Sequence, residues 1–262
     1  MPRSSWNGMF EVGLLAMPVR LYRATSEADY AFNQVDSKDG GRIRYRKFCE
    51  SCGREVPFEE IGKAVFVGDE VVVFTDEDLE SLPQADKIIR VTQFVTTGVV
   101  DLRTFGTAYN INPDDAGFRA YTLLRQQMKD EGKVGIAQFS MSGKDTLALV
   151  YPYGKTLVLQ RVCWPSEVTE PDFKILRTDV QVTDTERQLA RQLLDTMTAP
   201  WEPENFHSEW GEARQKIIEA RLAGEPAPEP SPATVQTAPI DIGAVLTASI
   251  AAEKAKQKEK AS

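Results

Sequence analysis

Residues 38–57 read KDGGRIRYRKFCESCGREVP, and their most regular feature is an arginine at every second position: Arg42, Arg44 and Arg46. On an extended strand, residues two apart point to the same face, so these three side chains would share one side. The DGG before the row is a turn signal, and the CESCG behind it marks a second turn. The sequence therefore predicts a β-hairpin with a row of cations on one face.

This predicted hairpin is basic although the whole chain is acidic. Between residues 42 and 54, five side chains are positive and one, Glu50, is negative. The chain of 262 residues carries 31 Lys and Arg against 39 Asp and Glu, a formal charge of −8. Since an acidic chain has no long-range attraction for polyanions, a local positive patch indicates a focused anion site.

The composition is that of a soluble globular protein, with 42% apolar and 27% charged residues. A chain of this length can bury a sizeable core. The opening MPRSSWNGMFEVG lacks the apolar run of a signal peptide, and no segment approaches about 18 uncharged apolar residues. We therefore expect a cytoplasmic protein, in which three cysteines do not form a disulfide framework.

Short apolar runs with period-two alternation predict a β-rich body up to about residue 177. Glycine-containing turns separate the last three runs, which is typical of an antiparallel meander or a barrel. The predicted strands cover residues 19–22, 32–35, 63–66, 71–74, 87–95, 102–111, 134–139, 146–151 and 156–162.

Helical periodicity follows this body. Thr183 is a candidate N-cap for the run DTERQLARQLLDTM, whose leucines fall at helical spacing. Further helices are predicted over residues 75–82, 117–131, 206–222 and 240–260. The predicted fold class is α+β, with a β-rich core at 1–178, a helical arm at 179–224, and a Pro/Ala linker with a lysine-bearing tail at 225–262.

Cys49 and Cys52 have the spacing of one half of a zinc knuckle, because two thiolates two residues apart can reach one tetrahedral ion. Cys163 and His207 are single and distant, so no metal site is predicted within one chain, although two copies could supply four thiolates. A thioredoxin-like redox role needs the pair at a helix start after a strand, whereas here it lies in a predicted hairpin. We predict no metal and no cofactor.

Catalytic signatures are missing from the sequence. It contains no phosphate-binding loop, nucleophile elbow or dinucleotide fingerprint. His207, the single histidine, lies among polar residues and is interpreted as a solvated side chain. The acidic run at residues 76–78 is explained by helix-start charges. We therefore predict a binding protein and no enzyme.

The arginine row has two interpretations, since alternating charges also protect an edge strand from aggregation. Four basic residues within six positions favour anion contact. The predicted DNA-binding residues are Arg42, Arg44, Arg46 and Lys47, followed by Lys38 and Arg20. A single-strand or RNA binder would add aromatic platforms, for which Tyr45 and Phe48 are the nearby candidates.

Four segments resemble the prokaryotic Ku proteins, the DNA-end-binding factors of non-homologous end joining. The segments are WNG at 6–8 with GLLAMPVRLY at 13–22, KDGGRIRYRK at 38–47 running into CESCGREVP at 49–57, VVFTDEDLE at 72–80, and GKVGIA at 132–137. The likeness covers residues 6–224, and the order and spread of the segments make it specific.

The resemblance implies a Ku-type β-barrel core with an extended DNA-encircling bridge, followed by a helical arm and a flexible tail. It also implies that two copies form a ring through which duplex DNA is threaded, and that the ring recruits an ATP-dependent end-joining DNA ligase. We therefore expect a homodimer that binds double-stranded DNA ends independently of sequence, without a catalytic cycle, and in association with the nucleoid. The enzyme alternative is a zinc- or lysine-dependent nucleic-acid processing activity.

Overall fold

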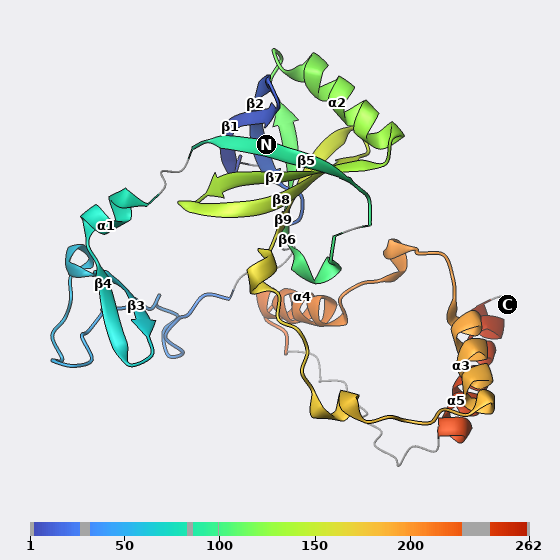
Figure 1. Cartoon of the computed structure of the whole chain (residues 1–262). Helices are drawn as coiled ribbons and strands as arrows, with labels where there is room; N and C mark the ends of the chain where they lie inside the picture. The colour runs from blue at the N-terminus through green and yellow to red at the C-terminus, as the bar shows by residue number, and fades with distance from the viewer. Residues whose placement is uncertain (1–2, 27–31, 83–85, 99, 227–241, 261–262) are drawn as a thin grey trace. The chain divides into compact units, whose positions relative to one another are not determined.

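The computed structural model describes residues 3–26, 32–82, 86–98, 100–226 and 242–260 (Figure 1). The chain divides into two compact units, Met1–Glu170 and Pro171–Ser262. All the described strands belong to the first unit, and the described elements of the second are helices and short 3-10 turns. No helix in the described part of the chain is both long and apolar enough to cross a membrane.

Seven strands of the first unit close into a barrel in the order β1-β2-β6-β9-β8-β7-β5. The strands are β1 (Trp6–Val12), β2 (Leu15–Arg23), β5 (Ile88–Thr96), β6 (Phe105–Pro113), β7 (Lys133–Met141), β8 (Lys144–Tyr153) and β9 (Thr156–Val162). Neighbouring strands run antiparallel, except that β1 and β5 pair in parallel and so close the barrel. The predicted α+β class with a barrel is confirmed.

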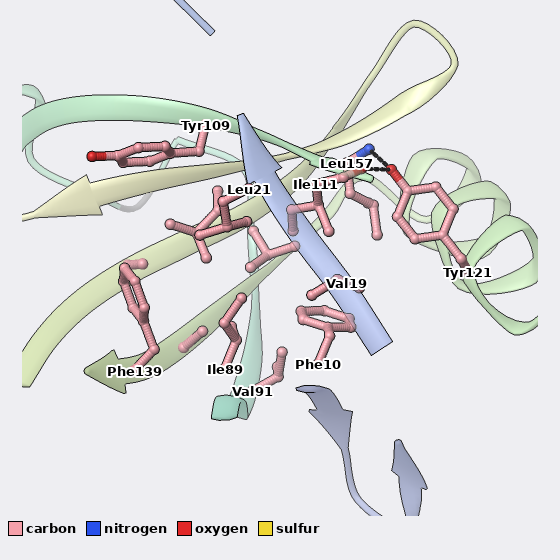
Figure 2. Packing of buried hydrophobic residues seen from close by; sticks show 14 of the residues in the cluster. Phe10, Val19, Leu21, Ile89, Val91, Tyr109, Ile111, Tyr121, Phe139 and Leu157 are labelled. Atoms are coloured by element: carbon pink, nitrogen blue, oxygen red, sulfur yellow. Dashed lines mark hydrogen bonds between the residues drawn. The ribbon is translucent and has the colours of Figure 1, made fainter. Parts of the chain in front are cut away.

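The interior of the barrel is filled by apolar side chains that alternate with outward-facing residues. On β2, for example, Met17, Val19 and Leu21 are buried while Pro18 and Arg20 between them are exposed. Figure 2 shows side chains of several strands meeting in this cluster. The cluster consists of Phe10, Met17, Val19, Leu21, Ile89, Val91, Tyr109, Ile111, Tyr121, Met128, Ala137, Phe139, Ala148, Val150, Leu157 and Leu159. Because side chains fill the interior, the barrel is a packed core, and a macromolecular ligand would contact its outer face.

Helix α2 (Phe118–Asp130) packs against the barrel through contacts with β8, β7 and β2. Its buried residues, Tyr121 and Met128, lie seven apart and therefore on one face of the helix. The Tyr121 hydroxyl donates a hydrogen bond to the Ile111 carbonyl at 2.8 Å and accepts one from the Leu157 N–H at 2.5 Å (Figure 2). The helix predicted at residues 117–131 is thus present and is anchored to two strands.

Strand β1 was not among the predicted strands. Its residue Gly8 lies in close contact with the backbone of Lys87, which explains why a glycine stands there. The Met9 N–H donates to the Lys87 carbonyl at 2.7 Å. A Cβ atom at Gly8 would lie 2.1 Å from that same oxygen, so the backbones meet at a distance that excludes a side chain. Trp6 holds the start of the strand, because its indole N–H donates to the Ser140 carbonyl at 2.9 Å.

A separate two-stranded sheet of the first unit is formed by β3 (Lys63–Val67) and β4 (Glu70–Phe74). It is followed by the short helix α1 (Asp76–Ser81). Thr75 and Asp78 form a capping box, in which each side chain bonds the backbone N–H of the other residue. The predicted strands and the predicted helix start in this region are therefore confirmed.

The second unit contains α3 (Asp184–Met197), α4 (Glu209–Leu222) and α5 (Ile242–Lys260). Thr183 caps α3 as predicted, in a capping box with Glu186. Helix α4 begins later than the predicted residue 206, because Ser208 acts as its N-cap and accepts a hydrogen bond from the Gly211 N–H at 3.0 Å. Helix α5 packs along α3. The predicted linker lies outside the described residues apart from positions 225 and 226.

Candidate nucleic-acid interface

The basic segment, residues 38–57, starts within a tight turn. The Asp36 N–H donates to the Gly41 carbonyl and the Gly40 N–H donates to the Asp36 carbonyl, both at 2.8 Å. The Asp36 carboxylate also accepts a hydrogen bond from the Lys38 N–H at 2.9 Å. Gly40 has a φ of 74°, in the left-handed region where glycine is favoured. The turn therefore holds the exposed Lys38 at its tip.

The run between the two turns is not the predicted regular strand. Val35 pairs with Arg42, and Phe48 pairs with Glu55, each as an isolated bridge. Each bridge closes its own turn, so residues 43–47 are left without a β-ladder in the described part of the chain. The prediction of a regular hairpin, and of a strand at residues 32–35, was therefore wrong. The basic residues instead occupy an irregular run between two closed turns.

Two of the predicted contact residues have partners within this region. The Arg46 guanidinium lies 3.3 Å from the Glu55 carboxylate. The Lys47 ammonium lies 5.7 Å from the centre of the Phe58 ring, within the range of a cation–π interaction. Arg46 and Glu55 are exposed to solvent, so their ion pair is weak and can be exchanged for a phosphate.

The other three predicted contact residues of the basic segment have no side-chain partner among the described residues. Lys38, Arg42 and Arg44 are exposed, and none of them makes a side-chain hydrogen bond or ion pair with another described residue. A polyanion that contacts such side chains releases counterions, which is the main source of sequence-independent affinity for DNA.

Arg20, the remaining predicted contact, lies on the outer face of the barrel. The strand register places it opposite Asn7 on β1 and opposite Asn112 on β6. These three residues and Lys87 line a cavity of about 580 Å³. In the described part of the chain, no hydrogen bond or ion pair joins Arg20 to the basic segment.

Lys87 and the two asparagines beside Arg20 were missed by the sequence analysis. Alternation along β2 could have placed Arg20 on the outside, but the register of three strands is not visible in the sequence. Asp114 and Asp115 line the same cavity and offset its two cations. The barrel surface is therefore less suited to a bare anion than the basic segment is.

The second turn of the basic segment contains the cysteine pair. The Cys49 N–H donates to the Arg54 carbonyl and the Gly53 N–H donates to the Cys49 carbonyl, both at 2.8 Å. Gly53 has a φ of 68°, which favours glycine at this position. The Arg54 guanidinium forms an ion pair with the Glu60 carboxylate, with 2.6 Å between nitrogen and oxygen.

The thiol of Cys49 lies among hydrogen-bond donors. The backbone N–H of Cys52, its thiol, and the N–H of Ser51 lower the pKa of Cys49, the first of these having the largest effect. Within the described residues, no third His, Cys, Asp or Glu joins the pair in a group that could hold a metal ion.

The β3–β4 sheet exposes apolar side chains on both of its faces. Their exposed fractions are 50% for Val65, 75% for Phe66, 63% for Val67, 54% for Val71, 47% for Val72 and 63% for Val73. An isolated two-stranded sheet is at best marginally stable in water. Contiguous exposed apolar side chains of this kind mark an interaction surface.

The fold and the site define a class of protein: an α+β protein with a closed seven-stranded β-barrel that carries a basic, turn-bounded segment and an apolar two-stranded sheet. Residues 11–190 match the family model described as the Ku70/Ku80 beta-barrel domain. The chain therefore belongs to the Ku family, which confirms the resemblance found in the sequence.

Three similar proteins are those of Frankia casuarinae, Mycolicibacterium smegmatis and Archaeoglobus fulgidus. The chain is 38% identical to the non-homologous end joining protein Ku of Frankia casuarinae, over 97% of this chain and 64% of that relative. It is 33% identical to the protein of the same name from Mycolicibacterium smegmatis, over 97% of this chain and 83% of that one. The corresponding protein of Archaeoglobus fulgidus is 37% identical, over 85% of this chain and 89% of its own length. The chain thus spans less than two thirds of the Frankia protein.

Proposed function

We propose that the chain forms a homodimeric ring that binds double-stranded DNA ends independently of sequence and takes part in non-homologous end joining. The relatives that it matches over most of its length are named for that process. A role in the cytoplasm, at the nucleoid, follows from the proposed target. The proposed function requires no catalytic cycle of the chain itself.

The observation that carries this proposal is the set of unpaired cations in the basic segment. Lys38, Arg42 and Arg44 are exposed and have no side-chain partner among the described residues, on a chain whose formal charge is −8. An acidic protein with a few uncompensated cations suits close contact with phosphates at one place and repels DNA elsewhere. This distribution is what a ring with a positive lining requires.

The β3–β4 sheet supports the dimer. Val65 and Phe66 on one strand and Val72 on the other are between 47% and 75% exposed. A second copy that covers these side chains would remove apolar area from water, which stabilises association by roughly 25 cal/mol for each Å². We propose that symmetric pairing of two chains buries this sheet.

Recruitment of an ATP-dependent end-joining ligase is part of the proposal, since a protein that holds a DNA end without chemistry needs a partner that seals it. The alternatives are a single-strand or RNA binder, for which the exposed Tyr45 and Phe48 would be stacking platforms, and a zinc- or lysine-dependent processing enzyme. Metal analysis and borohydride trapping of a lysine–sugar adduct test the enzyme alternative.

The decisive experiment uses DNA topology. Linear duplex, a covalently closed circle of the same sequence, and single strand are compared at physiological salt. A ring must be threaded from an end, so we expect strong binding to linear duplex and weak binding to the circle. Blocks placed on both ends beforehand should abolish loading, and blocks added afterwards should retain the protein. Equal affinity for circle and linear duplex contradicts the ring.

A further inference from the structure

Cys49 and Cys52 share one small turn that solvent reaches. The turn is closed by two backbone hydrogen bonds of 2.8 Å, from Cys49 to Arg54 and from Gly53 to Cys49. Two residues separate the cysteines along the chain, so both lie within the same turn. Cys49 is half-buried and Cys52 is exposed. The geometry thus places two cysteines in one closed turn that a small reagent can reach.

The surroundings of this pair favour a thiolate at Cys49. Hydrogen bonding by Cys52, the largest effect, and by the backbone N–H of Ser51 lowers the pKa of Cys49. Thiolates, rather than thiols, react with peroxides and disulfides, so a lowered pKa favours reaction at Cys49.

We propose that Cys49 and Cys52 form a reversible dithiol–disulfide site that hydroperoxides oxidise. The proposal of this modification site does not rest on the proposed DNA-binding function. The turn keeps the two cysteines close to each other, because Gly53 in the left-handed region reverses the chain just behind Cys52 and its N–H closes back on the Cys49 carbonyl.

The proposed reaction has two steps. The Cys49 thiolate attacks one oxygen of hydrogen peroxide, the O–O bond breaks, and the departing hydroxide takes up a proton to give water, leaving a sulfenic acid at Cys49. The Cys52 thiol then attacks that sulfur, the S–S bond forms as the S–O bond of the sulfenic acid breaks, and the hydroxyl group leaves with the proton of the Cys52 thiol as a second water. Two thiols lose two electrons in total and the peroxide gains them. A small dithiol reverses the reaction by exchange.

The test uses the full-length reduced protein, treated with a small molar excess of hydrogen peroxide and then with N-ethylmaleimide. Trypsin cleaves after Lys47 and Arg54, so one peptide, residues 48–54, contains both cysteines. Cys163, which is also exposed, falls in a separate peptide and serves as the internal control. We expect the first peptide to become lighter by two hydrogens and to escape labelling, and dithiothreitol should restore both thiols. The Cys163 peptide should oxidise about tenfold more slowly.

Two variants separate the steps. Cys52→Ser removes the resolving thiol, so the sulfenic acid at Cys49 should persist and be trapped by dimedone. Gly53→Val disfavours the left-handed turn, so ring closure should slow while Cys163 reacts as before. The proposal is overturned if the disulfides link two chains, if Cys163 oxidises as fast as Cys49, or if the purified protein retains zinc that keeps both thiols unreactive.

Discussion

The hydroxyl of Tyr121 accepts a hydrogen bond from the backbone N–H of Leu157 at 2.5 Å. The same hydroxyl donates to the Ile111 carbonyl at 2.8 Å. Tyr121 is 3% exposed, so water does not compete for either bond. One buried side chain thus joins α2 to the backbones of β6 and β9, two neighbouring strands of the barrel.

Replacing this tyrosine should destabilise the barrel. Tyr121→Phe keeps the ring but leaves the Leu157 N–H without its partner, which typically costs about 1–3 kcal/mol. We expect a lower midpoint of urea denaturation, with an unchanged dependence of the free energy of unfolding on urea concentration. Tyr153→Phe is the matched control, because Tyr153 is 71% exposed and should be neutral when changed. Equal effects of the two substitutions would show that the buried hydroxyl contributes nothing.

The same residue links stability to alkaline pH. Burial, the largest effect, raises the pKa of Tyr121 above its ordinary value of 10.0. The native state therefore keeps this proton to higher pH than the unfolded chain does. The stability that this retained proton contributes is complete below the pKa of Tyr121 in the unfolded chain. It is lost as the pH rises through the pKa of Tyr121 in the native state. The wild-type protein should therefore lose stability more steeply above about pH 10 than Tyr121→Phe does.

The glycine of the WNG segment should be intolerant of any side chain. A Cβ atom at residue 8 would lie 2.1 Å from the backbone oxygen of Lys87, so either β1 or the chain before β5 must move. We expect Gly8→Ala to cost roughly 2 kcal/mol or more, as overpacking against a fixed neighbour does. Gly62→Ala is the control, since its nearest neighbour would be 3.8 Å away. Thermal denaturation followed by circular dichroism distinguishes the two variants.

Local signals were sufficient to predict most of the fold. Thr75 and Thr183 are N-caps in the structure, as their sequence context indicated, because a capping box depends on residues three apart. Period-two alternation identified the strands of the barrel other than β1. That strand was missed because Gly8 and the polar Asn7 interrupt its apolar pattern, and its pairing with β2 and β5 is a long-range property.

The structure of the candidate site was harder to predict from the sequence than the fold. The charge of Arg42 and Arg44 and the turns around them could be predicted from residue types. The absence of a ladder between those turns could not, because pairing depends on which strands are nearby. Nor could the sequence reveal that Glu55 pairs with Arg46 and leaves other arginines unpaired.

Removal of the tail should affect the second unit alone. Residues 227–262 include α5, which packs on α3 and buries Ile250 to 6% exposure. Deleting them removes the helix that packs on α3, in which Leu189 and Leu193 are half-buried. We expect the barrel and the dimer to persist, while amide hydrogens of α3 exchange faster with solvent. Ile250→Asp should accelerate the same amides without shortening the chain. Loss of the fold in the truncated protein would contradict the proposed boundary.

The unpaired arginines should control the salt dependence of DNA binding. Arg42 and Arg44 have no side-chain partner among the described residues, so a phosphate that meets either one displaces counterions without breaking an ion pair. Arg42→Ala or Arg44→Ala should therefore weaken binding to linear duplex equally for every sequence. Each should also reduce the slope of log affinity against log salt by up to about 0.9.

Arg103→Ala is the matched control, because Arg103 already lies 2.6 Å from Asp101. Fluorescence anisotropy between 50 and 300 mM salt, roughly the range over which phosphate contacts are resolved, measures the slope. A slope that falls as much for the Arg103 variant, or an affinity loss confined to one sequence, would exclude the basic segment as the phosphate-binding site.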